Sequence, residues 1–285
     1  MNGMKRIYFS IVFLLGAFVG FAQDAAETIN NANEALKSKD YAKAFELYES
    51  AMNNLGDVQI DAAINFNIGF AGFQAEKYEA SLKYFDKAIA AGANVAGSYE
   101  YKGNAYAKMD NSKEAIASYL KAIESGAEGK GGIYYNAAIV AFKGKLYDQA
   151  VELFGNAFTE NTNAENAIFY KAASLKKLNK DEDYKQTLIL GAEKFPGNDK
   201  IASALASVYV SEGNSVYKKG AAILTGANAK VTAGTLKTSD PAYNEEVEKA
   251  KVEFKAALVI LEKAKALDAG NANAAKLIDA CKAVL

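Results

Sequence analysis

The most constraining feature of the sequence is a stretch that occurs four times at a spacing close to 34 residues. The four copies are KDYAKAFELYESAM at 39–52, KYEASLKYFDKAI at 77–89, NSKEAIASYLKAI at 111–123 and KLYDQAVELFGNAF at 145–158. Internal repetition at a fixed period of this length indicates a solenoid, because one repeat cannot bury its own apolar face and must stack on the next.

Each copy carries a small, an aromatic and a second small residue at positions i, i+4 and i+7. This spacing places the three on one stripe of a helix. A second helical stretch lies upstream of each copy and also repeats a small residue, so that two helices form a hairpin. The recurring sets are Ala44, Ser81, Ala115 and Ala150; Tyr48, Phe85, Tyr119 and Phe154; Ala51, Ala88, Ala122 and Ala157; and, upstream, Ala32, Gly69, Gly103 and Ala138.

The period and the small–aromatic–small pattern resemble the tetratricopeptide repeat (TPR) family. The Trp that the family carries in its first helix is absent; Tyr99 and Tyr134 stand in its place in two repeats, and Gly72 and Ser81 also depart from the pattern. The resemblance implies an all-α, TPR-like solenoid of stacked antiparallel helix hairpins. The third repeat fits best, through Tyr99, Gly103, Tyr106, Ala115, Tyr119 and Ala122.

The pattern predicts a signal peptide followed by two regions of helical repeats. After Asn198 the period breaks, and we expect a helix that ends near Gly213. A Gly- and Thr-containing segment without clear period predicts an inserted loop, and Asp240-Pro241 restarts a helix. The predicted organisation is a signal peptide at 1–22; five TPR-like repeats in 23–198, at about 25–58, 62–95, 96–129, 131–163 and 164–198; and divergent C-terminal repeats at 199–285, with a loop at 226–239 and a capping helix at 272–285.

The first 22 residues have the features of a secretory signal. Lys5 and Arg6 precede the apolar run IYFSIVFLLGAFVGFA, which ends in small residues before Gln23. We expect cleavage there and export to the periplasm or the extracellular space; an uncleaved anchor is the alternative. No Cys follows the run, so we expect no lipid anchor at this point. The ending FAQD resembles signal ends of Bacteroidota envelope proteins.

The composition excludes several chemistries. The chain has no His and no Trp, Arg6 is its one Arg, and its formal net charge is −1. A His metal site, a His general base and a Ser-His-Asp triad are therefore impossible, and nucleic acid is not an expected partner. Cys281 is the single cysteine, so no intrachain disulfide can form; a buried apolar role or an intermolecular disulfide remain. We expect no enzymatic activity, no cofactor and no metal.

In the TPR family the first helix of each hairpin lines a concave groove. The resemblance implies that one stripe of side chains along the first helices forms such a groove here. These side chains either bind a partner peptide or helix, or only pack adjacent first helices together. The carboxylate clamp of some family members is not expected, because Phe66, Glu100 and Tyr135 stand where cations are wanted. The groove residues are Phe66, Asn67, Phe70, Phe73, Asn104, Tyr135, Asn136, Ile139, Phe142 and Phe169.

The sequence thus predicts a non-enzymatic protein–protein interaction scaffold or adaptor in the bacterial cell envelope. It would bind a partner peptide or helix in the concave groove and would not span a membrane after signal cleavage. A receptor for a small ligand, such as a glycan or peptidoglycan fragment, is the alternative. A homo-oligomer, formed through residues 226–239 or the last helix, is compatible with either function.

Overall fold

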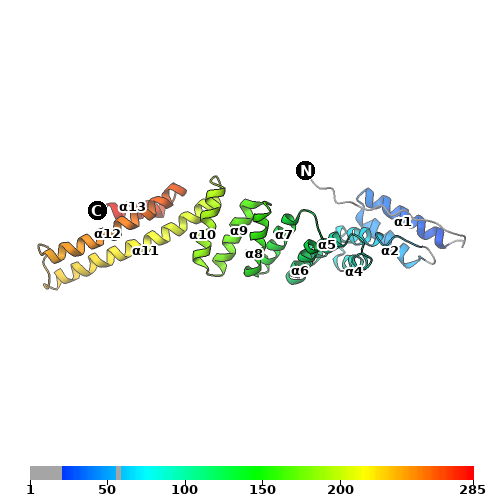
Figure 1. The fold of residues 1–285 in the computed structure, drawn as a ribbon, viewed down its shortest axis with the longest axis horizontal. Helices are drawn as coiled ribbons and strands as arrows, with labels where there is room; N and C mark the ends of the chain where they lie inside the picture. Colours follow the sequence, from blue (N-terminus) through cyan, green and yellow to red (C-terminus); the bar gives the residue numbers. More distant parts are fainter. Residues whose placement is uncertain (1–20, 56–58) are drawn as a thin grey trace. The chain divides into compact units, whose positions relative to one another are not determined.

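The computed structural model describes residues 21–55 and 59–285, and in these ranges it contains thirteen α-helices and no strand (Figure 1). The predicted all-α, TPR-like hairpin fold is confirmed. Apart from Phe21 and Ala22, the predicted signal peptide lies outside the described residues. The chain divides into two compact units, Met1–Ala167 and Ile168–Leu285, which are described in turn.

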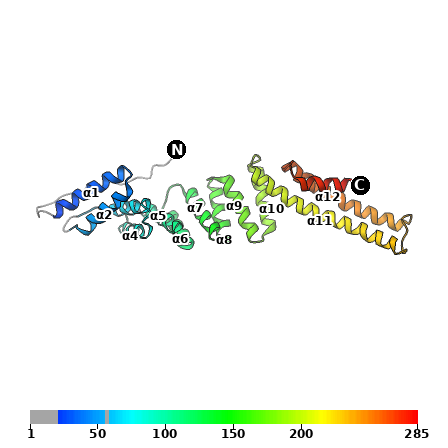
Figure 2. The same cartoon turned by 180° about the vertical axis from the view of Figure 1, so that it is seen from behind.

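The first unit is a row of helix hairpins. Contacts join the two helices of each hairpin, and also the second helix of one hairpin to the first helix of the next (Figure 2). This is the stacking that a helical repeat requires to bury its apolar faces. The helices are α1 (Phe21–Lys37), α2 (Tyr41–Asn53), α3 (Ile64–Gln74), α4 (Tyr78–Ala90), α5 (Val95–Lys108), α6 (Ser112–Glu124), α7 (Lys130–Lys143), α8 (Tyr147–Thr159) and the beginning of α9 (Ala164–Lys177).

The turn inside each hairpin has the same backbone geometry in every repeat. One non-glycine residue adopts a positive φ, between 56° and 64°, and the next residue donates its N–H to the carbonyl oxygen five residues earlier. This left-handed residue ends the first helix and satisfies one of its last carbonyl groups. The residues with positive φ are Lys39, Glu76, Asp110, Lys145 and Asn179.

The core of the hairpins is built from rings that lie on a small residue of the partner helix. Phe85 and Tyr119 are buried, and an added Cβ at Gly69 or Gly103 would lie 2.7 Å from the nearest ring atom of Phe85 or Tyr119. Real Cβ atoms do not approach that closely, so the ring occupies the space that a side chain would need. The repeated small residues of the first helices are therefore contact points for the rings.

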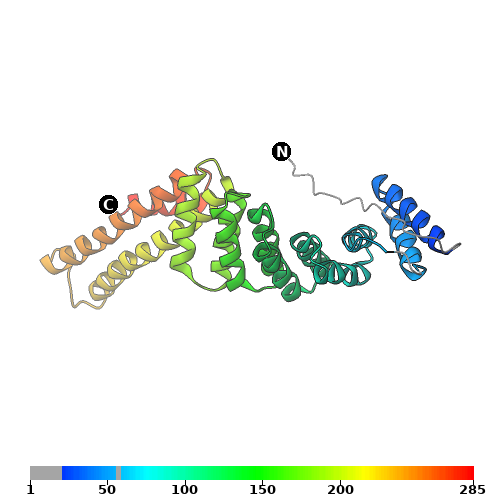
Figure 3. The ribbon, with the colours of Figure 1, turned by 45° about the vertical axis from the view of Figure 1, so that its right-hand side comes forward.

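The second unit contains the end of α9, α10 (Asp181–Lys194), α11 (Asp199–Thr232), α12 (Pro241–Leu267) and α13 (Ala272–Lys282). The long helices α11 and α12 lie side by side and make the most extensive helix–helix contact in the described chain. Figure 3 shows them in yellow and orange, with the red α13 beside α12. Their shared core contains Phe254, Ala257 and Leu261, and α13 adds Ile278 and Cys281.

The prediction of a helix end near Gly213 and of a loop at 226–239 is wrong in its boundaries. The helix α11 continues without a break to Thr232, so that only residues 233–240 connect it to α12. Gly213 and Gly220, both inside α11, are points of close contact with α12. An added Cβ at Gly213 would lie 2.6 Å from Leu261 Cγ, and one at Gly220 would lie 3.1 Å from the carbonyl oxygen of Ala250.

Replacing Gly103 by Ala tests the contact between ring and backbone. We expect Gly103→Ala to lower the free energy of unfolding by about 1–2 kcal/mol, because overpacking costs about 1–3 kcal/mol and the helix propensity of Ala offsets up to about 1 kcal/mol. Gly132→Ala is the matched control, since an added Cβ there meets nothing within 4 Å. Urea unfolding followed by circular dichroism measures both; an unchanged or higher stability for Gly103→Ala would contradict the packing.

Two substitutions at Gly226 test whether this part of the chain is helical. Gly226 lies inside α11 and an added Cβ meets nothing within 4 Å. We expect Gly226→Ala to stabilise the protein by up to about 1 kcal/mol and Gly226→Pro to destabilise it by about 3 kcal/mol. In a loop both changes would be nearly neutral. Helical content and urea midpoints of the two variants, compared with the parent chain, distinguish the two cases.

Candidate functional site

The candidate surface is the face formed by the first helices α3, α5 and α7, which contact one another in sequence order within the first unit. The aromatic residues on α3 converge on Tyr101 of α5. Its ring centroid lies 5.9 Å from that of Phe66, 5.2 Å from Phe70 and 5.4 Å from Phe73. Tyr101 is itself buried. These rings therefore join adjacent first helices, which is the packing role that the sequence left open.

Two of the predicted groove residues are not available to a partner, and the prediction is wrong for them. Phe66 is 3% exposed and belongs to a cluster with Phe85, Ala88 and Tyr101. Asn67 is 0% exposed and hydrogen-bonds Tyr48, whose pKa is raised above its ordinary value chiefly by burial. Both side chains face into the stacked hairpins because α3 is apolar on every side and is covered by its neighbours.

Asn104 is half-buried and serves the core as an acceptor. The Tyr119 hydroxyl donates a hydrogen bond of 2.7 Å to Asn104 Oδ1, and Tyr48 donates one of 2.6 Å to Asn33 Oδ1; each pair is separated by 15 residues. Burial, and secondarily the Glu100 carboxylate, raise the pKa of Tyr119. A buried hydroxyl requires such a partner.

Two other repeats carry an apolar pair at the positions of these polar pairs. Where the second helix carries Phe85, the residue 15 positions earlier is Phe70, and where it carries Phe154 that residue is Ile139. A phenol thus faces an amide, and a phenyl ring faces an apolar side chain. This alternation was visible in the sequence, but it acquired meaning only when the helix register was known.

Phe70 and Phe73 on α3 remain half-buried, and a further accessible part of the surface lies on α7. Asn136 is exposed, and Tyr135, Ile139 and Phe142 are half-buried. The rings of Tyr135 and Phe142 have Phe154 beneath them, with centroid distances of 5.8 and 6.5 Å. The two rings are therefore held against Phe154, and all three apolar side chains remain half-exposed.

The neighbouring helix α5 adds polar groups to this surface. Glu100 and Asn104 are half-buried, and Ala107, near the end of α5, is half-buried as well. The surface therefore combines an apolar, ring-containing part on α7 with a carboxylate and an amide on α5. Phe169, the last predicted groove residue, is half-buried, and its ring centroid lies 5.6 Å from that of Tyr170. It belongs to the second unit.

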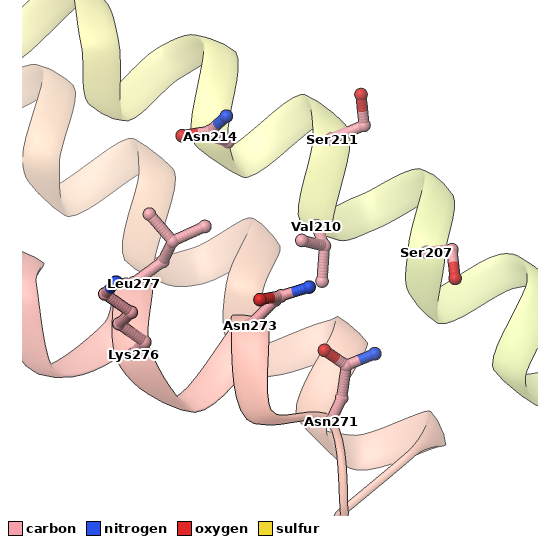
Figure 4. Close-up of a pocket in the computed structure, with 8 residues that line it drawn as sticks. All are labelled: Ser207, Val210, Ser211, Asn214, Asn271, Asn273, Lys276 and Leu277. Carbon is pink, nitrogen blue, oxygen red and sulfur yellow. The ribbon is translucent and has the colours of Figure 1, made fainter.

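The second unit contains a pocket that the sequence did not reveal (Figure 4). It has a volume of ≈ 430 Å³, and α11 and α13 supply its lining. Asn271 caps α13 by accepting a 3.0 Å hydrogen bond from the Ala274 N–H. No aromatic side chain lines the pocket. Its prediction required the packing of α13 against α11, which the sequence did not give. The lining residues are Ser207, Val210, Ser211, Asn214, Asn271, Asn273, Lys276 and Leu277.

Other candidate chemistry is limited in the part of the chain that the structure describes. Cys281 is 0% exposed, and burial raises the pKa of its thiol, so it packs as a small apolar residue. Within residues 21–55 and 59–285, no three His, Cys, Asp or Glu side chains form a group that could hold a metal ion. None of the helices described has an apolar stretch long enough to cross a membrane.

The helix hairpins, their repeated turn and the ring-to-backbone contacts define a TPR-like helical-repeat fold. Several solved structures are similar to the chain. A TPR repeat protein from Bacteroides fragilis is 24% identical, covers 92% of this chain and 99% of its own, and has a TM-score of 0.39. The MamA protein is 13% identical, with coverage of 61% and 93% and a TM-score of 0.50. YrrB, described as a TPR protein with an unusual peptide-binding site, is 21% identical, with coverage of 83% and 96% and a TM-score of 0.44.

No family model and no curated protein matches the chain.

The Tyr119–Asn104 pair can be tested by exchanging it for the pair of the next repeat. We expect Tyr119→Phe to lower the free energy of unfolding by about 1 kcal/mol, and Asn104→Ile to lower it by about 1–3 kcal/mol, because each leaves one polar partner behind. The double variant reproduces the apolar pair Phe154–Ile139 and should recover much of the loss. Urea unfolding of all four chains completes the cycle; additive losses would show that the two side chains are not coupled.

Proposed function

We propose that this chain is a non-enzymatic protein-interaction scaffold, and that it binds a peptide or helix of a partner protein on the face of α5 and α7. The observation that carries the proposal is the row of Tyr135, Ile139 and Phe142, which are half-exposed, with the rings of Tyr135 and Phe142 packed on Phe154. Rigid apolar side chains with one solvated side supply binding area at a low cost in conformational entropy.

Polar groups beside this row support recognition of a polypeptide. Asn136 is exposed on α7, and its amide can both donate to and accept from a main chain. Glu100 on α5 favours a partner that is neutral or basic near this point. Half-buried aromatic and aliphatic anchors with polar neighbours are the composition of protein-binding hot spots. Phe70 and Phe73, which contact Tyr101, and Asn104, which accepts from Tyr119, then hold the neighbouring hairpins together.

A small-ligand receptor for a glycan is less well supported. Sugars bind to flat aromatic platforms, and the pocket of the second unit has none among its lining residues. On the candidate face of α7, Phe154 partly covers the rings of Tyr135 and Phe142. Partly covered rings suit contact with the side chains of a peptide better than stacking against a sugar. The absence of His from the chain and the lack of any catalytic constellation in the sequence favour a function without a chemical step.

We also propose that the protein is exported, to the periplasm or out of a bacterial cell, and acts in an envelope assembly. The support is the sequence of residues 1–22, in which two cations precede an apolar run and small residues precede Gln23. Mass determination of the chain recovered from cells tests this: removal of residues 1–22 is the expected result, and a full-length chain in the cytoplasm would contradict it.

Site-specific photo-crosslinking tests the binding face. We expect a photo-reactive phenylalanine analogue in place of Asn136 to capture a defined protein band in cells, identified by mass spectrometry. The same analogue in place of Lys113, exposed on α6, is the positional control and should not capture that band. Adding Ile139→Lys should remove the band, since a charge would then enter the apolar contact, while the melting temperature stays within a few degrees.

Two outcomes would contradict the proposal. If Lys113 captures the same protein as Asn136, the partner does not select the face of α7. If neither position captures a protein and the purified chain instead binds glycan fragments in calorimetry, the receptor alternative replaces the scaffold.

A further inference from the structure

The two most exposed large apolar side chains in the described part of the chain lie on one helix. Val252 is 65% exposed and Val259 is 62% exposed, and both belong to α12. Ala256, between them, is exposed as well. Residues at i, i+4 and i+7 share one stripe of a helix, so these three form a single narrow apolar seam.

This seam has no function in the packing of α12 against α11. Phe254, Ala257 and Leu261 fill the contact between the two helices, and they lie on the opposite side of α12 from the valines. Val is a poorer helix former than the Lys, Glu or Ala that occupy other exposed positions, because its branched Cβ restricts χ1. Two exposed valines spaced by seven residues are instead typical of a helix that pairs with another helix.

Charges flank the seam at both ends and differ in sign. Glu248 precedes Val252 by four residues, and Lys263 follows Val259 by four residues; both are exposed on the side of the seam. If a second copy of α12 lies antiparallel, with the two-fold axis between Lys255 and Ala256, each Val252 faces a Val259 and each Glu248 faces a Lys263. In a parallel arrangement Glu248 would face Glu248 and Lys263 would face Lys263, so that like charges repel.

We propose that the protein forms a two-fold symmetric dimer in which α12 pairs antiparallel with α12 of a second copy. The interface is isologous, as a closed dimer requires, and its register is set by the Glu248–Lys263 pairs and the valines between them. The interactions that Glu248 and Lys263 make within the chain are weak enough to be replaced. Glu248 meets Lys251 at 3.0 Å and Lys263 lies 5.9 Å from the centre of the Tyr209 ring, and both are exposed interactions of little worth.

The seam is narrow, so the dimer is reversible and depends on concentration. The residues of the dimer contact do not include any residue of the face of α5 and α7. Each dimer would therefore carry two copies of that face. The inference does not depend on the proposed function, because the residues of the seam lie in the second unit and those of the binding face in the first.

Sedimentation equilibrium of the chain from Gln23 onward tests the dimer. We expect the average mass to rise from monomer to dimer with concentration, and Val252→Asp combined with Val259→Asp to keep the chain monomeric. Leu190→Asp is the control, because Leu190 is 39% exposed on α10 and the same charge there should leave the dimer intact. A parent chain that stays monomeric at all concentrations, or a dimer that survives both aspartates, would overturn the proposal.

Charge exchange tests the register. Glu248→Lys should weaken the dimer by about tenfold or more, because two lysines then face each other. Combining it with Lys263→Glu restores opposite signs and should restore the affinity of the parent chain. A combined variant that stays as weak as Glu248→Lys would show that these residues do not face each other.

Disulfide trapping tests the orientation. In a Cys281→Ala background, chains with Val252→Cys are mixed with chains with Val259→Cys and oxidised. The antiparallel pair should give mostly the mixed disulfide between the two kinds of chain. Disulfides that form mainly between identical chains would indicate a parallel pair and would overturn the proposal.

Discussion

The hairpins of the first unit depend on direct contact between a ring on the second helix and the backbone of the first. Phe85 lies on Gly69 and Tyr119 lies on Gly103, in each case across a separation of sixteen residues. Such an approach is possible only where the first helix presents no bulky side chain, and it allows only one register between the two helices. That register then decides which residue stands beside the ring, and it brings the Tyr119 hydroxyl to Asn104.

The second unit applies the same constraint with a different period. Gly213, Gly220 and Ala227 follow one another at intervals of seven along α11 and are buried. Ala250, Ala257 and Ala264 do so along α12 and are 0% exposed. Facing rows of small residues let two long helices approach closely, and Phe254 and Leu261 fill the space beside the glycines. The change from a spacing of about 34 residues to a spacing of seven is why the repeat pattern ends after Asn198 although the chain remains helical.

The fold class followed from the sequence because small and ring-bearing residues repeat in phase, and that pattern reports packing directly. The prediction of helix boundaries from the sequence failed at glycines, because glycine can either end a helix or permit close contact between two helices. Gly213 suggested a helix end, since glycine is a poor helix former, but the cost of about 1 kcal/mol is offset where the missing side chain permits the contact with Leu261. Gly226 suggested a loop but lies inside α11, where the helix continues although the glycine makes no such contact. The hairpin turns gave no signal either, because Lys39, Glu76 and Asp110 adopt the left-handed conformation that Gly usually supplies. For the candidate face, periodicity placed Phe66 and Tyr135 on one stripe but could not separate them, since burial depends on what the neighbouring helices place against each ring.

The first helices also differ in how their side chains are engaged. On α3 the rings contact Tyr101, and on α5 the amide of Asn104 accepts from Tyr119, so that part of each stripe holds hairpins together. In the hairpin of α7 and α8, the second helix carries Phe154, which has no hydroxyl group that needs a hydrogen-bond acceptor. The paired residue on α7 is the apolar Ile139. The exchange of a Tyr–Asn pair for a Phe–Ile pair therefore converts a polar, internally bonded position into an apolar side chain with one solvated side. Variation between repeats at a single paired position thus changes the chemistry of the first helix while the ring-to-backbone packing of the hairpin is kept.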